Sequence, residues 1–205
     1  MTGPSSRLLF ALIERMRFPQ ITGSGFALVA VLGIAAAATP QSETTGAGVA
    51  QAVRVDHTPK IDGTLDDPVW RTAPTVGDFR QREPLETQPA TEKTEVRILF
   101  DSRHIYFGIH CYDREPARIV GTQLRRDLSQ DLDDNFAVVI DPTLSRRNGY
   151  IFEINPLGTQ RDGQVIEEQS PNVNDSIVDP SWDGLWISAA KITDDGWTEI
   201  GRAHV

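Results

Sequence analysis

Cysteine is almost missing from this chain, since Cys111 is the single one among 205 residues. One cysteine excludes an intramolecular disulfide and any metal site built from several cysteines. Cys111 lies in the alternating run "IYFGIHCYD". A free cysteine in such a run typically fills space as a small apolar side chain. Its neighbour His110 would point to the opposite face of a strand, so no histidine is obviously placed to activate the thiol and we do not expect a catalytic cysteine.

Positive charge is also scarce. The chain has 20 lysines and arginines against 29 aspartates and glutamates, which gives a net charge of -9. A protein that binds nucleic acid needs a basic face to neutralise phosphates, so this balance argues against a nucleic-acid partner. The few basic pairs are scattered along the chain and are typical of a solvated surface.

Sequence motifs of common catalytic and zinc sites are missing as well. The four histidines lack the paired spacing of a zinc site, and no glycine-rich phosphate loop, nucleophile elbow or Ser-His-Asp order is present. The many carboxylates leave a glycosidase pair open, although an acidic solvated surface explains them equally well. Spacing along the sequence does not place two loop carboxylates in one cleft, so an enzymatic role is left undecided. The candidates for such a pair are Asp133, Asp134, Asp162, Glu167 and Glu168.

Long apolar runs are missing too. The longest stretch, from Gly25 to Ala38, is rich in alanine and falls short of the about 20 residues that a membrane-spanning helix needs. Two arginines, Arg15 and Arg17, precede it, and three alanines at its end form a small-residue cleavage pattern. We therefore expect a signal peptide over residues 1–38, with a retained anchor helix as the alternative.

The expected leader fixes the organisation of the rest of the chain. Met16 is a more typical start for a signal peptide than Met1, so the true start is expected at either residue. Residues 39–52 are small and polar and are expected to form a linker. The protein is then exported, to the periplasm, the outer membrane or the cell surface.

From Val53 onward, apolar residues alternate with polar ones. The runs "EVRILF" and "IYFGIHC" are joined by the polar "DSRH", which predicts a hairpin. "NFAVVID" and "YIFEIN" form a second pair around an Asn-Gly turn, and "LWISAAKI" and "GWTEI" form a third around "DDG". Three such hairpins predict an all-β fold, an antiparallel β-sandwich of the jelly-roll kind.

Calcium is the metal that this acidic composition favours. The run "DLDDNF" at residues 131–136 imitates the start of a calcium loop. Phe136 stands where an EF-hand needs glycine, and Pro142 stands where it needs the final glutamate, so an EF-hand is excluded. A looser calcium site in a β-sandwich loop remains open, because hard oxygen ligands suit this ion. Its candidate ligands are Asp131, Asp133 and Asp134.

Five motifs along the body of the chain resemble a known domain when they are taken together and in order. They are "KIDGTLDDPVW", "TEVRILFDSRHIYFGIHCYD", "DLDDNFAVVIDP", "GYIFEINPLGTQRDG" and "SWDGLWISAAKITDDGWT". The set resembles the family 9 carbohydrate-binding module-like domain over residues 53–198. More narrowly, it is similar to the version at the N-terminus of exported proteins whose C-terminal part is an outer-membrane β-barrel of unassigned function.

The resemblance implies a β-sandwich that binds an oligo- or polysaccharide through aromatic side chains, often with structural calcium nearby. A pyranose ring can stack its C–H face on an indole while its hydroxyls find a few fixed polar partners. In this interpretation the module is not catalytic and assists polysaccharide breakdown or uptake, with any glycosidic-bond hydrolase elsewhere in the full-length protein. The alternative is an accessory domain of the barrel protein without affinity for sugar.

The four tryptophans are the natural candidates for sugar stacking. Trp70 and Trp197 are expected in the core, because one closes the opening motif and the other begins a strand after a glycine turn. Trp186 fits either role. Trp182, in the loop "DPSWDG", is the best candidate for exposure. Candidate polar partners of the sugar are Asn155, Arg161, Asp162 and Asp183.

The end of the chain departs from the family pattern. After "DDGWT" the pattern would continue with an acidic-aliphatic strand and a proline, whereas this chain reads "EIGRAHV". Those seven residues resemble the translation of a common sequencing-adapter oligonucleotide. We therefore expect the β-sandwich to be C-terminally truncated, with residues 199–205 as a non-native tail and the last strand only partly paired.

Overall fold

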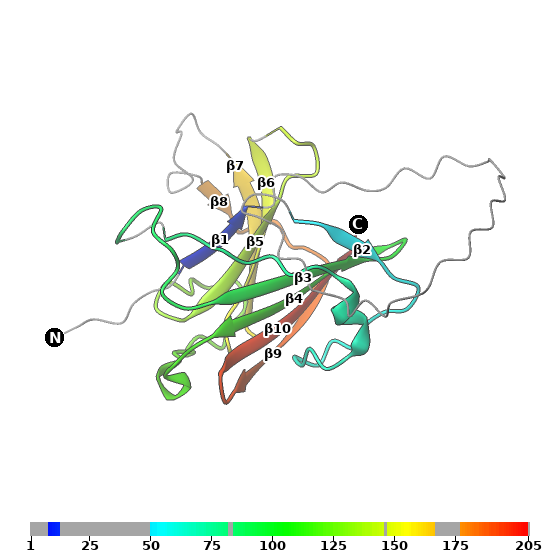
Figure 1. The fold of residues 1–205 in the computed structure, drawn as a ribbon. Coiled ribbons are helices and arrows are strands. Elements are labelled where there is room, and N and C mark those ends of the chain that lie inside the picture. Colours follow the sequence, from blue (N-terminus) through cyan, green and yellow to red (C-terminus); the bar gives the residue numbers. More distant parts are fainter. Residues whose placement is uncertain (1–7, 13–49, 82–83, 146, 167–176, 205) are drawn as a thin grey trace, which may run out of the picture.

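Two five-stranded sheets make up the molecule (Figure 1). The computed structural model describes residues 50–81, 84–145, 147–166 and 178–204, together with the backbone of residues 8–12 and 177. Sheet A contains, in spatial order, β1 (Leu8–Leu12), β5 (Asn135–Ile140), β6 (Asn148–Ile154), β7 (Gln160–Ile166) and β8 (Ile177–Asp179). Sheet B contains, in spatial order, β2 (Ala52–Arg54), β3 (Thr94–Phe100), β4 (His104–Tyr112), β10 (Gly196–His204) and β9 (Trp186–Thr193).

The three predicted hairpins are all present. β3 pairs with β4, β5 with β6, and β9 with β10, each in antiparallel register. The helical content of the described residues is limited to two short 3-10 turns, Pro68–Thr72 and Pro116–Arg118. The prediction of an all-β sandwich is confirmed. Strands β1 and β2 pair in parallel with β5 and β3, which the hairpin pattern does not predict.

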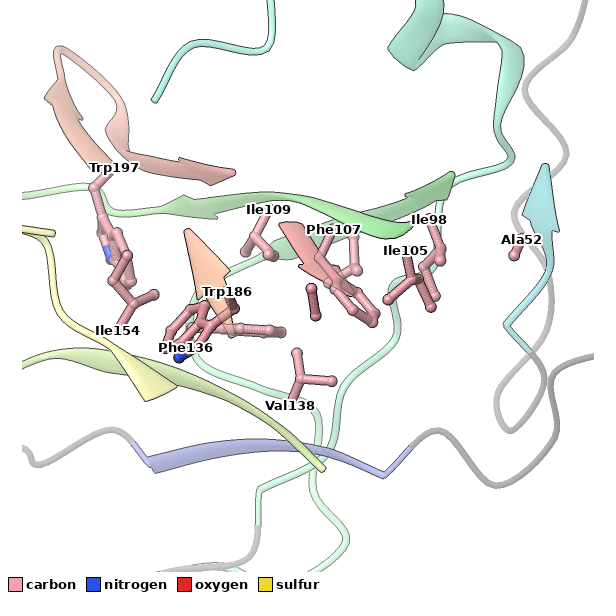
Figure 2. Packing of buried hydrophobic residues seen from close by; sticks show 12 residues of the cluster. Ala52, Ile98, Ile105, Phe107, Ile109, Phe136, Val138, Ile154, Trp186 and Trp197 are labelled. Carbon is pink, nitrogen blue, oxygen red and sulfur yellow. The ribbon is translucent and has the colours of Figure 1, made fainter. Parts of the chain in front are cut away.

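The main core lies between the two sheets. Figure 2 shows Phe107 and Ile109 of β4 facing Phe136 and Val138 of β5. Trp197 is buried in this layer, as predicted. Cys111 is packed against the same cluster, and burial raises the pKa of its thiol well above the ordinary value. Cys111 is half-buried and packs as a small apolar side chain, and its raised pKa disfavours the reactive thiolate.

A second core covers the outer face of sheet B. The segment that follows β2 folds back over this face and places Trp70, which is 1% exposed, against Leu99, Tyr106 and Ile200. Trp70 sits on a 3-10 turn whose first N–H group is capped by the carboxylate of Asp67. The prediction that Trp70 belongs to the core is confirmed, since apolar contacts surround its indole.

Gly63 is a point of close packing between this covering segment and β9. Its φ of +80° is one that glycine alone adopts easily, and a Cβ atom would lie 2.9 Å from the carbonyl carbon of Ala190. We expect Gly63→Ala to lower the free energy of unfolding by about 1–3 kcal/mol, measured by urea denaturation. Gly77→Ala is the control, because a Cβ there meets one atom at an ordinary 3.6 Å. Equal losses in both variants would contradict this explanation.

Strand β10 differs from what its sequence predicts. It lies inside sheet B, and residues 196–203 pair with β4 on one side and β9 on the other. The expectation of a partly paired last strand is therefore wrong, because "EIGRAH" completes the strand. The non-native origin of residues 199–205 stays a prediction, since backbone pairing does not depend on it.

The predicted leader lies almost wholly outside the described residues. The apolar stretch at residues 25–38 and the expected cleavage site belong to this undescribed part. Among the described residues, no helix is long and apolar enough to cross a membrane. The signal peptide and the linker stay predictions.

Candidate functional site

Trp182 is the outermost member of a row of aromatic rings that begins in the core. Its indole contacts Tyr150 at 4.5 Å and Phe152 at 5.8 Å between ring centroids, and both of these residues belong to β6. Phe152 in turn meets Trp186 of β9 at 5.3 Å. Trp186 is 7% exposed and part of the core, whereas Trp182 is half-buried. Of the two candidates for sugar stacking, Trp182 is the one that reaches solvent.

Arg126 lies beside this row and gathers polar groups from three parts of the chain. Its guanidinium donates to the side chains of Gln160 at 3.1 Å, Asp162 at 2.8 Å and Asp183 at 2.6 Å. It also pairs with the neighbouring Asp127 at 3.2 Å. Partial burial works against the charge, but these carboxylates raise the pKa of Arg126 above its ordinary value. The guanidinium is thus a fixed cation at the surface.

Asp162 and Asp183 differ in their access to solvent. The Asp162 side chain is 1% exposed, and its second oxygen accepts the backbone N–H of Gly184. Burial raises the pKa of Asp162, against the opposing effect of Gly184 and Arg126. The Asp183 side chain is 80% exposed and has a free approach from solvent. Among the predicted polar partners, Asp183 is therefore the one that a ligand can reach beside Trp182.

Asn155 is a structural residue in this fold. It is fully buried, and its oxygen accepts the N–H groups of Leu157 and Thr159, which closes the turn between β6 and β7. Its amide nitrogen donates to the Asp133 carboxylate at 2.8 Å. The prediction that Asn155 contacts sugar finds no support here, because every described contact of its side chain is internal.

Arg161 faces away from Trp182. Side chains alternate along β7, so Arg161 and Asp162 lie on opposite faces of sheet A. Arg161 pairs across the strands with the buried Glu153 at 2.8 Å. Burial raises the pKa of Glu153, and Arg161 opposes that rise. The structure therefore does not bring Arg161 together with the other predicted partners.

The three predicted calcium ligands are not arranged as a cation site. Asp133 accepts hydrogen bonds from the backbone and hydroxyl of Thr122, from the Gln123 N–H and from Asn155, and these bonds lower its pKa despite burial. Asp134 accepts the Val120 N–H, and Asp131 is exposed. In the part of the chain that the structure describes, no group of three acidic, histidine or cysteine side chains could hold a metal. Calcium binding stays a prediction, and it would require Asp133 to give up these donors.

The arrangement of the described carboxylates does not support the hypothesis of a glycosidase pair. Glu167 and Glu168 lie outside the described residues. Asp133 and Asp134 accept hydrogen bonds from backbone N–H groups of the loop between β4 and β5. Asp162 accepts hydrogen bonds from the Arg126 guanidinium and the Gly184 N–H. Each of these three carboxylates accepts hydrogen bonds from within the protein itself.

Comparisons with known proteins agree with this fold. No protein-family model matches the sequence, and no curated protein matches it closely. Two solved structures of a carbohydrate-binding module of family 9 from Caldicellulosiruptor kristjanssonii are similar. The complex with glucose has a TM-score of 0.51 at 13% identity, over 75% of this chain and 69% of that one. The complex with cellotriose has a TM-score of 0.50 at 12% identity, over 75% and 66%. The likeness is one of fold.

Three residues of the site could not be chosen from the sequence, namely Arg126, Tyr150 and Gln160. Arg126 stands in "QLRRDL", an arginine-rich run of a kind that is typical of a solvated surface. Tyr150 occupies an ordinary apolar position in an alternating strand. Gln160 links the site to sheet B by donating to Ser188 of β9 at 2.8 Å. These three side chains become part of the site only because the fold brings distant segments of the chain together, so no local sequence pattern marks them as site residues.

Proposed function

We propose that this protein is a non-catalytic carbohydrate-binding module and that it binds sugar at the surface formed by Trp182, Tyr150, Arg126 and Asp183, here called the Trp182 surface. The observation that carries the proposal is a half-exposed indole set beside a fixed guanidinium and an exposed carboxylate. An indole can accept the C–H face of a pyranose, while the two charged groups donate to and accept from its hydroxyls.

The fold supports this assignment. The two similar modules of family 9 are described in complex with glucose and with cellotriose. Three carboxylates, those of Asp127, Asp162 and Asp183, surround the single guanidinium of Arg126. Such an excess of carboxylates favours neutral sugars over anionic ones, because the negative charge of an anionic sugar would be repelled.

The place of the module in a larger system is a finer proposal. The sequence resemblance and the apolar stretch at residues 25–38 support an exported envelope protein that takes part in polysaccharide breakdown or uptake and is joined to an outer-membrane β-barrel. Calcium belongs to this finer proposal too. A fusion of residues 1–52 to a reporter enzyme tests export, because the reporter should be found in the periplasm.

Replacing Trp182 with alanine tests the proposed site. We expect Trp182→Ala to weaken binding of gluco- or xylo-oligosaccharides by about tenfold or more, since one stacked aromatic commonly dominates such a contact. Isothermal titration calorimetry measures the affinity. Tyr112→Ala is the matched control, because this half-buried ring stacks on His110 at 3.8 Å on the outer face of sheet B. Its affinity should equal that of the wild type.

Two outcomes would contradict the proposal. Unchanged affinity in folded Trp182→Ala would place the sugar elsewhere on the module. No heat from any gluco- or xylo-oligosaccharide with the wild-type protein would favour the alternative of an accessory domain without affinity for sugar.

A further inference from the structure

Asp162 is a buried carboxylate at the centre of the Trp182 surface. It lies on β7 directly across from Phe152 of β6, on the face of sheet A that looks into the sandwich. Burying a carboxylate at 1% exposure is costly unless its oxygens accept hydrogen bonds. Both oxygens do so, and each bond leads to a different loop.

The first bond leads to Trp182. One oxygen of Asp162 accepts the N–H of Gly184. A Cβ atom on Gly184 would lie 2.7 Å from the Cη2 atom of Trp182 and 3.0 Å from the same Asp162 oxygen. The Gly184 backbone is therefore enclosed between the carboxylate and the indole, so the position of Asp162 sets the position of the ring.

The second bond leads to Asp183. The Nη2 atom of Arg126 donates to Asp162 at 2.8 Å and to Asp183 at 2.6 Å. One guanidinium nitrogen carries two hydrogens, so these two carboxylates use both of them. Its Nη1 atom donates to Gln160. Asp162 thereby anchors the cation that holds the exposed carboxylate in place.

We propose that Asp162 is the positioning residue of the Trp182 surface, because its two oxygens tie the Gly184 amide and Arg126 to β7 and so fix Trp182 and Asp183 relative to each other. The effect on sugar affinity rests on the function proposed above. The effect on the geometry of Trp182 does not.

Chemistry requires a carboxylate at this position. Both partners, the Gly184 N–H and the Arg126 guanidinium, are donors, and asparagine has the same shape as aspartate but presents one acceptor and one donor. In Asp162→Asn, the side-chain NH2 group therefore faces one of these two donors in either orientation of the amide, and that hydrogen bond is lost. Protonation of Asp162 has a similar consequence, since a protonated oxygen becomes a donor.

The charged groups that face Asp162 are Arg126, Asp127 and Asp183, all from neighbouring loops. Burial raises the pKa of Asp162 and the nearby carboxyl group of Asp127 adds to the rise, while Gly184 and Arg126 oppose it. Asp162 therefore takes up its proton at a higher pH than an ordinary aspartate. The Trp182 surface should loosen as the pH falls into that range.

Tryptophan fluorescence tests the proposal without any sugar. We expect Asp162→Asn to increase acrylamide quenching of the emission, and we expect this difference to vanish in a Trp182→Phe background, because the other three tryptophans are unaffected. Lowering the pH should reproduce the change in the wild type and leave Asp162→Asn flat. Asp195→Asn is the matched control on an exposed turn, where the carboxylate bonds to Thr193 and His110.

Circular dichroism checks that Asp162→Asn is folded, and Arg126→Lys provides a second variant if it is not. Arg126 is 40% exposed, and lysine keeps its charge but cannot bridge two carboxylates in the same way, so quenching should again rise. Quenching equal to the wild type in both variants would overturn the proposal, as would a pH response that persists in Asp162→Asn.

Sugar titration separates the two proposals. If the wild type binds gluco- or xylo-oligosaccharides, Asp162→Asn should lower the affinity by about tenfold. The control variant Tyr112→Ala should bind these sugars as tightly as the wild type. If the wild type binds none, the proposed function fails, and the fluorescence of the variants still decides the role of Asp162.

Discussion

Replacing Glu199 with methionine is expected to stabilise the protein by about 3 kcal/mol at pH 8, which is the upper end of the cost of an unpaired buried polar group. Glu199 lies on β10, and its side chain is buried in sheet B opposite Ile109 and Ala190. One of its oxygens has no hydrogen-bond partner among the described residues. Methionine has a similar length and removes the buried carboxyl group.

The gain should depend on pH in a definite direction. Burial raises the pKa of Glu199 well above its ordinary value, so the folded protein holds a proton that the unfolded chain releases. The stability that this proton represents is fully present below the unfolded pKa of about 4.3 and is lost as the pH rises toward the folded pKa. The difference between Glu199→Met and the wild type should therefore grow between pH 5 and pH 8.

Urea denaturation at several pH values measures this difference. Glu115→Met is the control, because Glu115 is exposed and pairs with Arg118 at the surface, where an ion pair has little effect on stability. Its free energy of unfolding should follow the wild type at every pH. A Glu199→Met variant that is less stable than the wild type at pH 8 would mean that the carboxyl group has a partner in solution.

The hairpins could be predicted because the signal for each of them is local. In β3 and β4, alternation of apolar residues and a polar turn specify the pairing without reference to any other segment. The polar strand β7, "QRDGQVI", carries little apolar alternation, and its place beside β6 depends on the tight turn that Asn155 closes. Such a strand is held by its neighbours more than by its own sequence.

The site could be predicted only in part, because its residues meet through pairing at long range. Arg126 reaches Asp162 and Asp183 across 36 and 57 positions in the sequence. Within "TQRDG", either Arg161 or Asp162 had to face into the sandwich, and the register with β6 decides in favour of Asp162. A one-residue shift would exchange the two, so the motif alone names both residues. The exposure of Trp182 could be predicted without knowing any strand register, because this residue lies in a loop. Its half-exposed position agrees with that prediction.

Replacing Trp70 with alanine should cause the largest loss of stability, about 3–5 kcal/mol, as is usual when a buried tryptophan is truncated in a core. Its indole packs on Gly108 of β4, where a Cβ atom would lie 2.8 Å from the ring. The loss of this contact should release the whole segment that follows β2 from sheet B. Urea denaturation measures the change, and Trp182→Ala, a half-buried tryptophan, should lose less than half as much.

The same residue separates folding from binding. Trp70→Phe retains an aromatic ring over Gly108, so it should restore most of the stability, and its sugar affinity should equal that of the wild type, because Trp70 lies on the outer face of sheet B, whereas Trp182 packs on sheet A. A loss of affinity in folded Trp70→Phe would contradict this division. A Trp70→Ala loss below about 0.5 kcal/mol, the size of an ordinary surface effect, would show that the covering segment is not part of the cooperative core.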